Sequence, residues 1–248
     1  MTQPQLYVFA ISHYCEKARW ALDYLGIEYE IKYLAPGLHA ERMTNLGADG
    51  SSLPVLVNAG KLIQGSSAII SWAESAPNNG RTLACKHSPL MSDITQRVDD
   101  VLGVHVRRMY YSEALVEHPE TVLPIFADYL GEEESALLRG IWEFVVAAMT
   151  EKMDLGADQG RESREIVLQQ LDWFDELLGD GRDYLLGDIF TRVDLSAASL
   201  LAPLAMVAEH PTYGNLQMPP RIAQDVIEWQ SRPISQFVTR AYRRHRKD

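Results

Sequence analysis

Apolar and polar positions follow different periods in two parts of the chain. Up to residue 76, short apolar runs predict strands at 6–10, 29–33, 53–57 and 61–64. Helical spacing predicts helices at 12–25 and 66–73, and residues 40–46 are compatible with a short one. The resulting order is β-α-β, a variable link, and then β-β-α. This order predicts a small α/β unit.

Beyond that unit the pattern is helical. Pro77-Asn78-Asn79-Gly80 opens a linker that we expect to span 77–89. Apolar residues at helical spacing predict helices that begin near Ile94, Leu138, Val167 and Ile222. A segment that is apolar on nearly every side, Leu195 to Leu204, predicts a buried helix. Residues 117–134 contain two prolines and several acids, so we expect an extended connection with at most short helices. The sequence predicts an α/β domain at 1–76 and an all-α domain at 90–248.

Charge and composition exclude several classes of protein. The net charge of −11 argues against a nucleic-acid partner, because phosphate contacts need a basic surface. The basic run from Arg240 to Lys247 is expected to be a solvated end of the chain. Cys15 and Cys85 are too few for a disulfide framework or a metal cluster, so no metal is expected. Without a long apolar run, we expect no membrane partner and a cytoplasmic location.

The junction between the first strand and the first helix carries the strongest chemical signal. Ser12 lies at this junction, where a serine commonly caps the helix. Cys15 lies one turn further on, near the helix end that favours negative charge. Any chemistry of the protein is therefore expected to start here.

Four segments, in this order along the chain, carry a family resemblance. They are the S-x-x-C-x-K-x-R-x-A-L run from Ser12 to Leu22, Leu53-Pro54-Val55-Leu56, Ser66-Ser67-Ala68-Ile69, and Phe190 to Ala198. Together they resemble the cytosolic glutathione transferases, of a bacterial type with serine at the active-site position. The resemblance implies a thioredoxin-like N-terminal domain followed by a helical-bundle C-terminal domain. It also implies glutathione as co-substrate and a homodimer.

The resemblance assigns roles to residues of the first domain. Ser12 takes the place of the residue that hydrogen-bonds the glutathione sulfur, although it can equally be a simple helix cap. Leu53, before a cis Pro54, would pair its main chain with the cysteinyl part of glutathione. Ser66 and Ser67 would offer helix amides to the γ-glutamyl carboxylate, or merely cap their helix.

One position departs from the family pattern. Gly65 stands where the family usually has Glu, Asp or Gln, and Gln64 comes one place earlier, where strand alternation would aim it the other way. His39 is a candidate for the glycyl carboxylate, although a solvated loop histidine is the simpler interpretation. Tyr110 and Tyr111, which follow Arg107 on a helix beside the expected acceptor pocket, could orient an electrophile, but at helical spacing they also suit packing.

The resulting functional hypothesis is an enzyme that transfers the glutathione thiolate to a small hydrophobic electrophile. Tyr7 is the rival to Ser12, since some classes use a tyrosine of the first strand, but it would point to the wrong face. One alternative is a thiol-disulfide or deglutathionylating enzyme that uses Cys15. The other is a non-catalytic binding protein of the same fold, for which Gly65 is the best sequence argument. Thr191-x-x-Asp194 predicts a helix capping box with a role in folding.

Overall fold

The computed structural model describes residues 3–213 and 217–246. In the first part of the chain the elements are β1 (Gln5–Val8), α1 (His13–Tyr24), β2 (Glu30–Tyr33), α2 (His39–Leu46), β3 (Val55–Asn58), β4 (Lys61–Gln64) and α3 (Ser66–Ser75). The four strands form one sheet in the order β2-β1-β3-β4. β1 and β2 are parallel, while β3 is antiparallel to both of its neighbours. The predicted βαβ and ββα units are thus present.

The two faces of this sheet bury different sets of side chains. Leu6 and Leu56, which are register partners, join the large core on the side of α1 and α3. Tyr7 and Val55 point the other way and pack with Met43 of α2. This alternation confirms that Tyr7 faces away from the side of Val8.

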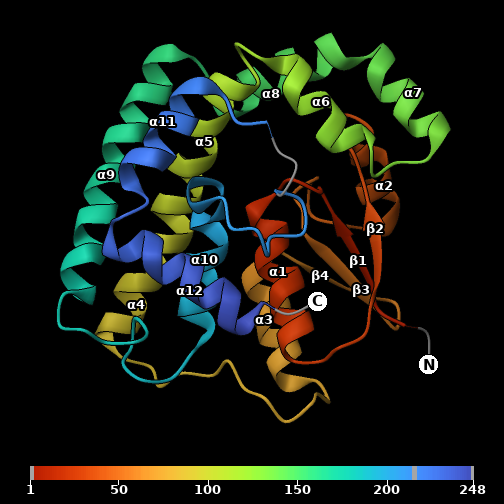
Figure 1. Ribbon diagram of the computed structural model, residues 1–248. Helices are drawn as coiled ribbons and strands as arrows, with labels where there is room; N and C mark the ends of the chain where they lie inside the picture. Colours follow the sequence, from red (N-terminus) through yellow and green to blue (C-terminus); the bar gives the residue numbers. More distant parts are fainter. Residues whose placement is uncertain (1–2, 214–216, 247–248) are drawn as a thin grey trace.

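The second part of the chain is helical. Its elements are α4 (Pro89–Gln96), the π-helix η1 (Arg97–Leu102), α5 (Gly103–Ala114), α6 (Pro119–Ala127), α7 (Glu132–Gly140), α8 (Trp142–Met153), α9 (Ala157–Leu178), α10 (Arg192–Ala205), α11 (Pro220–Trp229) and α12 (Pro233–His245). α4, η1 and α5 follow one another without a break, as the stripe through Ile94 predicts. A thioredoxin-like α/β domain followed by a helical-bundle domain is therefore the architecture (Figure 1).

Residues 117–134 contain α6 and the start of α7, each nine residues long, so the short helices that the prediction allowed are present, whereas the extended connection was wrong. α6 begins at Pro119, in the first turn where proline fits, and Glu120 follows it there. α7 begins with three glutamates at the end of the helix that favours negative charge. α6 and α7 pack against each other, and Figure 1 shows both on the side of the molecule where α2 lies. The helix predicted through Leu138 is divided between α7 and α8, because the chain leaves helical geometry at Ile141.

The buried helix of the second domain is α10. Each of its residues from Val193 to Leu204 is buried. The predicted capping box is formed: the Thr191 amide donates to Asp194 Oδ2 over 2.8 Å. The Leu185 amide also donates to Asp194 Oδ1 over 2.7 Å, so the carboxylate joins the preceding loop to the helix. α1 packs against α10 and α3, between the sheet and the C-terminal helices (Figure 1).

The basic run at the end of the chain is solvated only in part: Arg243 and Arg244 are exposed, whereas the prediction was wrong for Arg246. α12 buries Tyr242 against Trp20 of α1, with ring centroids 4.3 Å apart. Arg246 then lies 2.7 Å from Glu16 and 2.8 Å from Asp23, both on α1. The Arg246 side chain is 6% exposed. Lys247 lies outside the described residues.

Candidate functional site

A cavity of about 260 Å³ lies where the two domains meet. The first domain lines it with three segments: residues 9–14 after β1, Pro36 and His39, and residues 51–53 before Pro54. The second domain lines it with side chains from α5, α6, α8 and α10, and with Tyr213. Of the predicted site residues, Ser12, His39, Leu53, Tyr110 and Tyr111 lie on its wall. Pro54, Gln64, Ser66, Ser67 and Cys15 do not.

Ser12 caps α1 and lines the cavity at the same time. Its Oγ accepts a hydrogen bond from the Cys15 amide over 3.3 Å, so the capping interpretation is correct. A hydroxyl has one hydrogen to donate and can rotate it. The amides of His13 and Tyr14 also lie in the first helical turn, where no intrahelical acceptor exists. This end of α1 thus favours an anion in the cavity.

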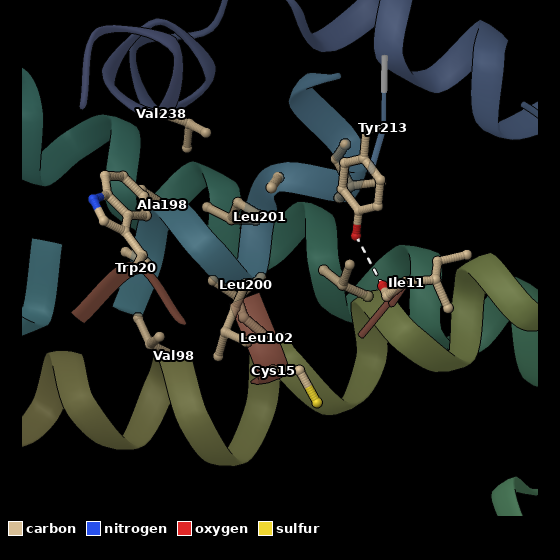
Figure 2. Packing of buried hydrophobic residues seen from close by; sticks show 14 of the residues in the cluster. Ile11, Cys15, Trp20, Val98, Leu102, Ala198, Leu200, Leu201, Tyr213 and Val238 are labelled. Carbon is tan, nitrogen blue, oxygen red and sulfur yellow. Dashed lines mark hydrogen bonds between the residues drawn. The ribbon is translucent and has the colours of Figure 1, made fainter. Parts of the chain in front are cut away.

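Cys15 faces the core instead. It is 1% exposed, and Figure 2 shows it among the buried hydrophobic residues. Burial raises the pKa of its thiol to about 11, although contact with the Ser12 side chain lowers it. A thiolate at Cys15 is therefore scarce at neutral pH, and the sulfur is covered.

His13 and Tyr14 are cavity residues that the sequence interpretation did not select. His13 Nε2 lies 3.0 Å from the Gly103 carbonyl of α5, so this nitrogen carries the proton. Burial, and after it the charge of Arg107, lowers the pKa of His13 to about 3. The Tyr14 hydroxyl donates to the Asp99 carbonyl over 2.8 Å. The sequence signal that could have identified them is their position, since both directly follow Ser12 in the first turn of the helix.

The loop before Pro54 carries the other wall of the first domain. The Leu53-Pro54 bond is cis, as the resemblance implies. Gln64 accepts from the Asp49 amide over 3.0 Å and donates to the Ser52 carbonyl over 2.9 Å. Gln64 is thus engaged in holding this loop, which fits the expectation that it points away from the position of Gly65.

The start of α3 lies outside the cavity wall. Gly65 has φ +93°, a conformation that side-chain-bearing residues rarely adopt, which accounts for glycine at this position. Ser66 is buried, and the Ser67 hydroxyl donates to Asp99 Oδ2 over 3.0 Å. Lys17 Nζ lies 3.0 Å from the same hydroxyl. The Ser67 side chain therefore belongs to a network between the domains.

Three further predicted residues have clear surroundings. His39 stands edge-on to the Phe9 ring with centroids 4.8 Å apart, and burial lowers its pKa. Tyr110 and Tyr111 are largely buried on α5, and burial raises the pKa of both phenols. Neither phenol hydroxyl has a hydrogen-bond partner within the described part of the chain. The described residues contain no group of three or more His, Cys, Asp or Glu side chains placed to hold a metal ion.

Residues 6–81 match the family model of the glutathione S-transferase N-terminal domain. The comparison with curated proteins found no match. Among the described residues, no helix combines the length and apolar character needed to cross a membrane.

Solved structures match over the whole chain. A glutathione transferase of Phanerochaete chrysosporium is 15% identical with a TM-score of 0.68, covering 100% of this chain and 99% of its own. A glutathione S-transferase of Ceriporiopsis subvermispora, in complex with glutathione, is 16% identical with a TM-score of 0.64 and the same coverage. One of Methylobacterium radiotolerans, with glutathione sulfonate, is 20% identical with a TM-score of 0.52, covering 96% of this chain and 95% of its own.

The matched domain, the sheet order and the helical second domain define a protein of the glutathione transferase fold. Residues 6–81 belong to the glutathione S-transferase N-terminal domain family, and the chain as a whole shares its fold with solved glutathione transferases.

Proposed function

We propose that the protein binds glutathione and transfers its thiolate to an electrophile held between the domains. The observation that carries this proposal is the position of Ser12 and Leu53 on the wall of one cavity lined by both domains. Ser12 would contact the glutathione sulfur, and the Leu53 main chain would pair with its cysteinyl unit. Glutathione in the complexes from Ceriporiopsis subvermispora, and its sulfonate in those from Methylobacterium radiotolerans, support this choice of ligand.

The chemistry required of Ser12 is modest and fits its surroundings. Because its Oγ already accepts from the Cys15 amide, its hydrogen is available for a sulfur in the cavity. A thiolate is a charged acceptor and binds such a donor more strongly than a neutral thiol does. The end of α1 adds a favourable potential. The thiol proton leaves to solvent as the thiolate forms. The thiolate then attacks the electrophile, and a leaving group, where there is one, departs with its bonding pair.

The rest of the cavity provides a place for the acceptor. Phe126, Met149, Met153 and Pro203 supply apolar surface from the second domain. Tyr110 and Tyr111 supply two hydroxyls, without partners among the described residues, that can donate to an electron-rich leaving or activating group. Holding both reactants in one site supplies the proximity that bimolecular reactions in solution lack.

The surroundings of Cys15 disfavour the thiol-disulfide alternative. That chemistry needs an accessible thiolate, whereas this sulfur is 1% exposed with its thiol pKa raised to about 11. A non-catalytic binding protein is the second candidate. It is favoured by the engagement of Gln64 with the 49–52 loop and of Ser67 with Lys17, which leaves fewer free groups for the γ-glutamyl end.

Calorimetry with reduced glutathione separates these functions. Binding at millimolar concentration or below, together with turnover of 1-chloro-2,4-dinitrobenzene that falls in Ser12→Ala and persists in Cys15→Ala, is the expected result. Binding without turnover supports the second candidate, and no binding contradicts the proposal. A homodimer also rests on the family resemblance, and light scattering at micromolar concentration tests it. The proposed cytoplasmic location rests on the composition of the chain.

A further inference from the structure

Arg107 and Arg108 are neighbours on α5 with opposite surroundings. Arg108 lies 2.7 Å from Glu162 and also pairs with Asp154. Arg107 lines the cavity, and no carboxylate forms an ion pair with it in the described chain. Its Nε is enclosed and has no hydrogen-bond partner. A half-buried guanidinium without an acceptor costs solvation free energy that the protein does not recover by itself.

The cavity around Arg107 is positive, although the protein is strongly acidic overall. Among the residues that the structure describes, no aspartate or glutamate lines the cavity, whereas Arg107 and Lys152 do. The two cations act on different parts of the wall. The charge of Arg107 bears on His13, Tyr14 and Tyr111, and that of Lys152 bears on His39. An anion in the cavity therefore meets no opposing carboxylate.

We propose that Arg107 binds a carboxylate on the electrophile, so that the acceptor is an amphipathic organic acid with an aromatic or aliphatic body. This inference rests on the proposed function in placing the acceptor here. The guanidinium offers a planar pair of donors that suits a carboxylate. The Phe126 ring and the Met149 and Met153 side chains offer apolar contact for the body of the acid.

An arenecarboxylate with an activated ring chlorine is the probe. In its reaction the glutathione thiolate forms a carbon–sulfur bond at the chlorine-bearing carbon. The carbon–chlorine bond then breaks, and chloride leaves with the bonding pair. The carboxylate takes no part in this exchange, so its contact with Arg107 affects only binding and position.

The first experiment compares 4-chloro-3,5-dinitrobenzoate with its methyl ester, each rate divided by its uncatalysed rate. The wild-type protein is expected to prefer the acid by about tenfold, the size of one charge-assisted contact. Arg107→Gln should abolish the preference, Arg107→Lys should keep part of it, and Arg108→Gln should leave it unchanged. An equal preference in wild type and Arg107→Gln overturns the inference.

The second experiment needs no glutathione and no turnover. Calorimetry measures 3,5-dinitrobenzoate and its methyl ester on the wild type, Arg107→Gln and Lys152→Gln. Binding of the acid that is about tenfold weaker in Arg107→Gln supports the inference even if glutathione fails to bind, which would contradict the proposed function alone. Loss of acid binding in Lys152→Gln only, or weakened glutathione binding with unchanged dinitrobenzoate binding in Arg107→Gln, overturns it.

The melting temperature distinguishes a ligand-binding role from a structural one. Since Arg107 has no partner in the described chain, Arg107→Gln is expected to melt at or above the wild-type temperature without ligand. A clearly lower melting temperature means that Arg107 stabilises the fold and contradicts the inference.

Discussion

The Nζ of Lys17 lies 2.6 Å from Oδ1 of Asp99, joining α1 of the first domain to the π-helix η1 of the second. The Lys17 side chain is 1% exposed, so its charge depends on this partner. Burial lowers the pKa of Lys17, and Asp99 opposes that effect. The pair therefore holds together the two domains that line the cavity.

Asp99→Asn should lower the free energy of unfolding by about 3 kcal/mol, because it leaves a buried ammonium without its counter-charge. Lys17→Met combined with Asp99→Asn should be less destabilised than Asp99→Asn alone. Urea unfolding of the wild type, both single variants and the double variant measures this. Strict additivity of the two single effects would show that the residues act independently.

Removing the Arg246 side chain should destabilise the protein by about 3 kcal/mol, since Glu16, 2% exposed, then loses its buried partner. Arg243→Ala is the matched control, because Arg243 lies in the last turn of α12, close to Arg246, and its side chain is 70% exposed. The control should change the free energy of unfolding by less than about 0.5 kcal/mol. Equal effects of the two substitutions on the free energy of unfolding would show that the Arg246 side chain is solvated and would contradict the prediction.

Asp194→Ala should lower the free energy of unfolding by about 3 kcal/mol, because the buried Leu185 and Thr191 amides each lose an acceptor. The affinity for glutathione should stay within about twofold, since Asp194 is not on the cavity wall. Thermal unfolding and calorimetry test the two statements. Equal melting temperatures of variant and wild type would refute the structural role.

Stability should fall in acid through His13, whose folded pKa of about 3 lies below its ordinary value of 6.5. The unfolded chain takes up this proton from about pH 6.5 downward, and the folded chain does not until about pH 3. The contribution of His13 to the free energy of unfolding is complete above pH 6.5. Between pH 6.5 and about pH 3 it is lost at about 1.4 kcal/mol per pH unit. Urea unfolding at pH 7, 6 and 5 should show a smaller loss for His13→Gln than for wild type; parallel losses contradict this.

Local patterns predicted those parts of the fold that local physics determines. The helix start at Ser12 and the capping box at Thr191 depend on groups within a few residues of each other. The segment from α6 to the turn after it was predicted less well, because distant aromatic contacts position it: Phe126 of α6 lies 5.9 Å from Phe9, and Tyr129 in the turn before α7 lies 4.6 Å from Tyr33, between ring centroids.

The same limit applies to the site and to the end of the chain. Ser12 and Leu53 were predicted through motifs and lie on the cavity wall. His13 and Arg107 were not selected as site residues, because their place in the cavity depends on segments that are far apart in the sequence. The pairing of Arg246 with Glu16 joins residues far apart in the sequence, which no periodicity reveals.

The acidity of bound glutathione tests the central claim, that Ser12 stabilises its thiolate. Ultraviolet absorbance of the thiolate is followed against pH in wild type, Ser12→Ala and Ser88→Ala, the last of which removes a comparable cap from α4. The thiol in the wild-type complex should ionise at lower pH than free glutathione. Ser12→Ala should reduce the thiolate-to-thiol ratio about tenfold, the worth of one charge-assisted hydrogen bond, and Ser88→Ala should not. Identical titration curves for wild type and Ser12→Ala would contradict the claim.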